Sequence, residues 1–128
     1  LPAVIKELHR ILEPGGVAVI EVANKRTLPK MFRYWFKKSK VNPFDKKPSN
    51  LKNIDKDGFY NYHPAYVEDL FRKSGFEIDN ILSVSNFRSQ TMKKIFKTKA
   101  LVALEKKLQK PLASLRFAPS IYYRLIKK

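Results

Sequence analysis

Residues 12–24, with the sequence LEPGGVAVIEVAN, place a tight turn directly before a run of small apolar residues. Proline and two consecutive glycines end a preceding helix and turn the chain. The run that follows, residues 17–23, is apolar except for Glu21. Such runs of valine, isoleucine and alanine are typical of strands buried on both faces of a sheet. A helix, a turn and a buried strand are half of a β-α-β unit, and the strand before the helix is missing.

The other elements follow from the spacing of apolar residues. Residues 4–12 predict an amphipathic helix, and a second helix begins at Pro64 and ends at Gly75. A strand is predicted by the alternating apolar residues Phe76, Ile78, Leu82 and Val84, which would all face one side of a sheet. The polar Asn80 interrupts this alternation. Residues 92–108 predict a lysine-rich helix and residues 120–127 a last strand, with Pro111 and Pro119 as breaks.

A sheet of only three strands leaves the apolar strand 17–23 with an unpaired edge in water. The chain also begins with Leu1 and not with Met. Both features suggest that residues 1–128 are the C-terminal portion of one larger domain.

Charge is concentrated in two blocks. The chain carries 27 lysines and arginines against 11 acidic residues, a net charge of +16, and 22 of these cations lie in residues 25–56 and 93–128. Such blocks favour phosphates, anionic lipids or acidic substrates. With no cysteine and two histidines, no metal site is expected. No apolar run is long enough to span a membrane, and the N-terminus lacks the pattern of a signal peptide. We therefore expect a cytoplasmic protein, with peripheral contact to an anionic membrane as an option.

Residues 25–60 have no single period and form a basic, aromatic insertion or lid. Residues 28–38 predict a short helix and residues 41–58 a loop. Three roles stay open for the helical part. Its aromatic side chains pack on the sheet while its lysines are solvated, or it contacts a membrane or lipid-like substrate, or, least favoured, it stacks on nucleic-acid bases.

The segments ELHRILEPGGVAVIEVAN and YHPAYVEDLFRKSGFEIDNILSVSNFR resemble the C-terminal half of class I S-adenosylmethionine-dependent methyltransferases of the type 11/12 kind. The resemblance covers nearly the whole chain. It implies an α/β, Rossmann-like sheet in which residues 17–23 are strand 5, the strand after "KSGFE" is strand 6, and an antiparallel strand 7 lies between them.

The family's cofactor loop, an acidic residue followed by Gly-x-Gly-x-Gly, is not in this sequence. The resemblance therefore implies that S-adenosylmethionine is bound mainly by an upstream half. This chain alone would be inactive and would supply the side that holds the methyl acceptor.

Candidate site residues lie where the resemblance puts the acceptor, beyond the strand ends. His63 is the candidate general base, with a helix cap as its alternative role. The candidate acceptor contacts are Asn24, Arg26, Trp35, Tyr60, Asn61, Tyr62 and Arg88. Asn24 has a turn cap as its alternative role, and Arg88 a structural salt bridge.

The leading hypothesis is an S-adenosylmethionine-dependent methyltransferase with a small-molecule or lipid-like acceptor. The alternatives are a basic binding module for anionic membrane or nucleic acid, and a non-catalytic methyltransferase-like subunit. A nucleic-acid partner is disfavoured because no nucleic-acid-binding motif is visible.

Overall fold

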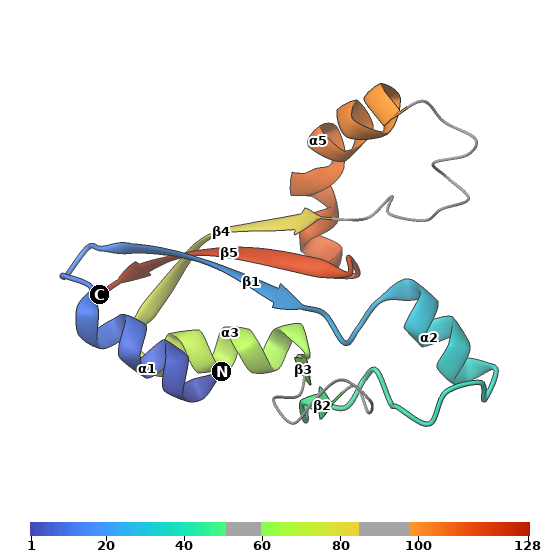
Figure 1. Cartoon of the computed structure of the whole chain (residues 1–128), viewed down its shortest axis with the longest axis horizontal. Coiled ribbons are helices and arrows are strands. Elements are labelled where there is room, and N and C mark those ends of the chain that lie inside the picture. Colours follow the sequence, from blue (N-terminus) through green and yellow to red (C-terminus); the bar gives the residue numbers. More distant parts are fainter. Residues whose placement is uncertain (51–59, 85–97) are drawn as a thin grey trace.

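The computed structural model describes residues 1–50, 60–84 and 98–128 (Figure 1). Helix α1 (Pro2–Ile11) leads to strand β1 (Val17–Ala23), helix α2 (Leu28–Trp35) and two short strands, β2 (Ser49–Asn50) and β3 (Tyr60–Asn61). Helix α3 (Pro64–Lys73), strand β4 (Phe76–Val84), helix α5 (Thr98–Leu115) and strand β5 (Ser120–Lys127) follow. The chain is a mixed α/β structure with its main elements in the predicted order.

The main sheet has three strands in the order β1-β5-β4. Strand β5 runs antiparallel to both neighbours, with Ile121 opposite Val22 of β1 and opposite Ser83 of β4. Strands β1 and β4 therefore run parallel to each other on either side of it. The last strand thus occupies the central position that the resemblance implies. Strands β2 and β3 form a separate antiparallel pair.

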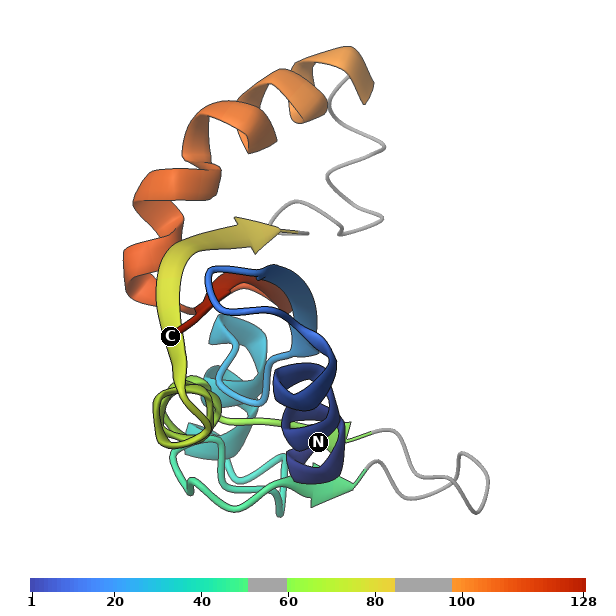
Figure 2. The same cartoon turned by 90° about the vertical axis from the view of Figure 1, so that its left-hand side faces the viewer.

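Helices α1 and α3 lie side by side under one face of this sheet (Figures 1 and 2). Each turns an apolar stripe toward the strands, and the Phe71 ring of α3 meets the Tyr123 ring of β5 edge-on at 5.2 Å. The buried core consists of Ile5, Ala18, Val22, Val67, Phe71, Phe76, Ile121, Tyr123 and Leu125. Burial of this apolar surface is the main driving force for the fold.

The predicted turn before β1 is present. The N–H of Gly16 donates to the carbonyl of Glu13 (2.8 Å), and Gly15 has a φ of +78°, which a residue with a side chain rarely adopts. Gly15 N–H also donates to the carbonyl of Lys127 (2.9 Å), so the turn is fixed to the end of β5. The Lys127 ammonium donates to the carbonyls of His9 and Leu12, which satisfies the end of α1.

The prediction of which β4 side chains face the core is wrong beyond Ile78. The register against β5 shifts between Ile78 and Asn80, so Asp79 is the extra residue of a β-bulge. A bulge moves every later side chain to the opposite face. Ile81 and Ser83 therefore face the core, while Leu82 and Val84 lie on the other face, toward the side where α5 packs on β4.

Strand β1 is buried on one face and not on both. Ala18 and Val22 are buried in the core, but Val17 and Val19 are exposed on the opposite face, Val19 to 65%. Helix α5 packs on β4 and does not extend over β1 (Figure 1). The second edge of β1 is paired, within the described residues, only at its carboxyl end, where Tyr62 bridges to Asn24. The predicted exposed apolar edge is therefore present.

Helix α5 extends further than predicted, since it continues past position 111 to Leu115. The predicted start of this helix at Met92 lies outside the described residues. No helix in the described ranges is long and apolar enough to cross a membrane.

An ion-pair cluster around the buried Glu68 carboxylate ties α3 to the segment that connects α5 with β5. The Glu68 carboxylate accepts from the Arg116 guanidinium and lies 3.5 Å from the Tyr123 hydroxyl. Arg72 adds a second cation at 3.7 Å. Burial and the nearby Glu68 carboxylate raise the pKa of Tyr123, so its hydroxyl stays protonated.

Candidate functional site

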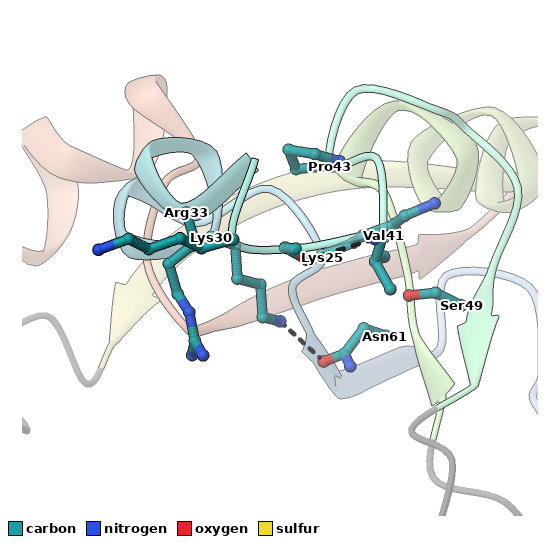
Figure 3. A pocket seen from close by; sticks show the side chains of 9 residues that line it. Lys25, Lys30, Arg33, Val41, Pro43, Ser49 and Asn61 are labelled. Carbon is teal, nitrogen blue, oxygen red and sulfur yellow. Dashed lines mark hydrogen bonds between the residues drawn. The ribbon is translucent and has the colours of Figure 1, made fainter. Parts of the chain in front are cut away.

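Two cavities lie at the carboxyl end of β1, between this strand end, α2 and β3. The larger has a volume of about 630 Å³ and is lined by Glu21, Ala23, Thr27, Pro29, Lys30, Arg33, Asn61, Pro119 and Ser120. The smaller has a volume of about 240 Å³ and is lined by Lys25, Lys30, Arg33, Lys38, Ser39, Val41, Pro43, Ser49 and Asn61 (Figure 3). Lys30, Arg33 and Asn61 line both. In open α/β sheets, ligands commonly bind beyond strand ends of this kind.

Lys25 fixes the loop that closes the smaller cavity. Its buried ammonium donates to the carbonyls of Asp45 (3.0 Å) and Lys47 (2.7 Å), and the Asp45 carboxylate lies 4.0 Å away. Burial lowers the pKa of Lys25, and the charge of Asp45 opposes that shift. The lysine therefore serves as a cross-link between the end of β1 and residues 45–47.

Lys30 points inward from α2, as Figure 3 shows. Its ammonium donates to the carbonyl of Asn24 (2.8 Å) and to Oδ1 of Asn61 (3.2 Å). An ammonium carries three N–H donors, so one N–H has no acceptor in the part of the chain that the structure describes. Burial lowers the pKa of Lys30.

Helix α2 faces the protein with its Lys30 side and not with its aromatic side chains. Met31 is buried and the Lys30 ammonium reaches the protein interior, while Leu28, Phe32, Trp35 and Phe36 are exposed. These four residues, which we call the outer face of α2, recur at spacings of three and four and therefore share one side of the helix. Of the three roles left open for this helix, packing of the aromatic side chains on the sheet is contradicted for Phe32, Trp35 and Phe36, because the Lys30 ammonium occupies the inner side.

Trp35 belongs to this outer face and lines neither cavity. It is 62% exposed, and its ring meets Phe32 edge-on at 5.9 Å. The structure therefore places this predicted acceptor contact on the surface of α2, on the side away from Lys30.

Asn24 is only 1% exposed, and both polar atoms of its side chain form hydrogen bonds. Its amide donates to the carbonyls of Arg116 and Ala118 (2.8 Å each), and its Oδ1 accepts from the N–H of Arg26 (2.7 Å). Asn24 therefore holds the end of β1 to the start of β5, as in its alternative role of turn cap. Arg26 lies over the ring of Phe117 at 4.9 Å, and its buried Nε has no hydrogen-bond partner among the described residues.

His63 is the N-cap of α3, its alternative role from the sequence. Its Nδ1 accepts from the N–H of Ala65 at 3.2 Å, so the ring proton of the neutral form is on Nε2. Burial, followed by the charges of Arg26, Lys25 and Lys46, lowers the pKa of His63. In this arrangement the basic nitrogen already has a donor. The general-base role stays a prediction.

The segment before α3 contributes one cavity residue and an aromatic group. Asn61 is 7% exposed and lines both cavities, while its role as an acceptor contact stays a prediction. Tyr62 stacks on Tyr66 and lies 6.2 Å from Tyr60, and burial raises the pKa of Tyr62. The backbone of Tyr62 pairs with Ala23 and Lys25, which brings Asn61 to the end of β1.

Arg88 lies outside the described residues. Sequence reasoning missed Lys30, Arg33, Lys38 and Ser49, which line the smaller cavity. The net charge of residues 25–56 indicated that cations gather here, but the loop has no periodic pattern to say which of them point inward.

The described residues do not fit S-adenosylmethionine. Gly15 and Gly75, the glycines with positive φ, are used in turns, and a Cβ on Gly75 would lie 2.7 Å from His9. No glycine-rich loop therefore offers close backbone approach to an adenosyl group. In the described part of the chain, no three His, Asp or Glu side chains group around a metal position.

No protein-family model matches this chain, and no curated protein matches it either.

Proposed function

We propose that this chain is the acceptor side of an S-adenosylmethionine-dependent methyltransferase, with a small-molecule or lipid-like acceptor. The observation that carries the proposal is the position of β5, antiparallel between the parallel strands β1 and β4. Together with the Pro-Gly-Gly turn before β1, this is the arrangement expected for strands 5, 7 and 6 of the resembling family. Mixed sheets with one antiparallel strand are common, so the strand order supports the proposal only in combination with the turn.

The exposed face of β1 and its largely unpaired edge support contact with further protein in the active enzyme. Val17 and Val19 are exposed, and most of this strand edge is unpaired within the described residues. An apolar edge of this kind is a hazard in an isolated sheet. We propose that protein outside residues 1–128 pairs with it and binds the cofactor, for which this chain has no suitable loop.

The larger cavity is the proposed acceptor site. Ala23 and Ser120 line it from the strand ends, and Thr27 and Pro29 line it from the start of α2. Glu21 lies in its wall and accepts from the Tyr122 hydroxyl at 2.9 Å, which fixes the direction of the carboxylate. These residues would bind the acceptor, orient it and exclude water, which alone lowers the barrier of a two-substrate reaction.

The proposal is tested by cofactor binding. Labelled S-adenosylmethionine is titrated into the full-length product of the gene and into residues 1–128, and binding is measured by equilibrium dialysis. We expect saturable binding to the full-length product and none to residues 1–128. The absence of binding to both would contradict the enzymatic proposal and favour a non-catalytic role.

A second candidate function, attachment to an anionic membrane, is favoured by the outer face of α2. Four large apolar side chains face water on one side of an eight-residue helix and its cap, with Arg33, Lys37 and Lys38 close by in sequence. Exposed aromatic residues beside cations suit the boundary between lipid headgroups and acyl chains. This attachment is compatible with a lipid-like acceptor and does not require the enzyme.

Sedimentation with vesicles tests the attachment. The variant Phe32→Ser/Trp35→Ser is compared with Val102→Ser/Leu104→Ser, which removes two exposed apolar side chains from α5. We expect the first variant alone to lose binding to vesicles that contain phosphatidylglycerol. Equal binding by both variants would contradict a role for the outer face of α2.

A further inference from the structure

We propose that the smaller cavity is a binding site for a phosphate group, held by Lys30, Arg33, Lys38 and the amide of Asn61. The binding itself does not depend on the enzymatic proposal. Its use as the grip on an acceptor's anionic group rests on the proposed function, because the two cavities share a wall.

The charge of the cavity is the first argument. Four cationic side chains line it, from Lys25, Lys30, Arg33 and Lys38, and its described lining contains no carboxylate. Asp45 lies beside Lys25, at 4.0 Å, and is not a lining residue. Cations that line one cavity without a counter-charge among its lining residues raise the local potential, and a bound anion relieves their mutual repulsion.

The donors that remain unused are the second argument. Among the described residues, Lys30 has one N–H left after its contacts with Asn24 and Asn61. The amide N–H₂ of Asn61 has no acceptor among the described residues, although the side chain is held in place through Oδ1. Arg33 and Lys38 form no side-chain hydrogen bond or ion pair within the described residues. Donors that lack an acceptor and line one cavity from α2, its following loop and β3 suit a tetrahedral oxyanion.

Phosphate fits this donor set better than a carboxylate does. A guanidinium binds two oxygens of one phosphate, and ammonium and amide donors on other sides reach the remaining oxygens. The hydroxyls of Ser39 and Ser49 line the same cavity and add two more polar groups. Val41 and Pro43 form an apolar part of the wall, which suits the carbon skeleton next to the phosphate (Figure 3).

Two double variants distinguish a specific phosphate-binding site from non-specific attraction by positive charge. Arg33→Gln/Lys38→Gln removes two exposed cations that line the cavity, while Lys37→Gln/Lys40→Gln removes two exposed cations from the same segment that line neither cavity. Both variants lower the net charge equally. Sodium phosphate is titrated at constant ionic strength into residues 1–128, and the side-chain amide signal of Asn61 is followed by NMR.

We expect saturable binding to the parent, weakened at least about tenfold in Arg33→Gln/Lys38→Gln and less than about twofold in the control. Asn61→Asp keeps an acceptor for Lys30 but replaces the amide donors with a carboxylate. It should abolish saturable binding without lowering the melting temperature. Equal weakening in both double variants, undiminished binding by Asn61→Asp, or no saturation in the parent would each overturn the proposal.

The source of the phosphate is decided by a parallel measurement with vesicles that contain phosphatidic acid. If the group belongs to a lipid, Arg33→Gln/Lys38→Gln loses vesicle binding and the control retains it, and sodium phosphate competes. If it belongs to a water-soluble molecule, both double variants bind vesicles equally while differing in phosphate affinity. Either result supports the site, and neither requires S-adenosylmethionine, so failure here is distinct from failure of the enzymatic proposal.

Discussion

Helices α2 and α3 begin in the same way and face the protein with opposite sides. Each starts with a proline in its first turn and a side-chain N-cap, Thr27 for α2 and His63 for α3. Helix α3 buries Val67 and Phe71 against the sheet, whereas α2 leaves its aromatic residues in water and turns the Lys30 ammonium inward. Amphipathic spacing therefore defines two sides of a helix but does not say which one meets the protein.

The carbonyl groups at the strand end explain the difference. Beside α3 lies an apolar sheet, which rewards burial of apolar side chains. Beside α2 lie the carbonyl of Asn24 and the side-chain oxygen Oδ1 of Asn61, which need a donor, and Lys30 provides it. The sheet with α1 and α3 is thus the scaffold, and the region around α2 carries the cavities and the exposed apolar surface.

The largest effect we expect comes from Phe71→Ala compared with Phe36→Ala. Phe71 is fully buried, so its loss should lower the free energy of unfolding by about 4 kcal/mol. Phe36 is exposed on the outer face of α2, so its loss should change stability by less than about 0.5 kcal/mol. Urea denaturation of both variants measures this, and equal losses would show that the outer face is packed.

Next in size is Glu68→Gln, which leaves Arg116 without its carboxylate in the scaffold. We expect a loss of about 2–3 kcal/mol, less than for a fully buried pair because Arg116 is partly exposed. The neighbouring variant Asp69→Asn, in an exposed pair with Arg72, should cost less than about 0.5 kcal/mol. A Glu68→Gln protein as stable as the parent would contradict the structural role of this cluster.

A smaller effect is expected for Lys30→Met, which removes the donor to Asn24 and Asn61 beneath α2. We expect a loss of about 1–2 kcal/mol, since the methionine keeps most of the aliphatic contacts but leaves two acceptors without their partner. Lys37→Met, at an exposed position of the same segment, should be nearly neutral. Thermal unfolding of the two variants would disprove the inward orientation of Lys30 if their midpoints were the same.

The smallest effect is a pH dependence from His63. Its pKa in the folded protein is lowered from the ordinary value of 6.5, so below pH 6.5 the unfolded chain binds a proton that the folded chain resists. Stability should therefore fall as the pH falls through 6.5. His63→Asn keeps an N-cap but does not titrate, and its urea midpoint should change less between pH 7.5 and 5.5. Identical pH profiles would contradict the lowered pKa.

Much of the scaffold was predictable because its signals are local. The turn before β1 and the bounds of β1 and β5 follow from proline, glycine and short apolar runs. The face of β4 beyond Ile78 was not predictable, because one extra residue at Asp79 reverses the parity. The exposure of one face of β1 was likewise not predictable, because it depends on which elements cover the strand. A run of apolar residues does not indicate how many of its faces are covered.

The site was predicted in part. Asn61, a predicted acceptor contact, lines both cavities, whereas Asn24 and His63 are in their alternative roles as caps. The direction of the Lys30 side chain is set by the carbonyl of Asn24 and the Oδ1 of Asn61, and Lys38 lies in a loop without periodicity. Sequence spacing alone could not select them from the other lysines of the insertion.

Methyl transfer by the full-length product of the gene is the most direct test of the proposed function. Label from S-adenosylmethionine is followed into lipid and small-molecule extracts, and Ala23→Leu, which narrows the larger cavity, is compared with Ala100→Leu on the exposed side of α5. We predict labelled product in the parent, a raised KM for the acceptor in Ala23→Leu alone, and unchanged cofactor affinity in both. No label in any extract, or equal kinetics for the two variants, would contradict an acceptor site at the end of β1.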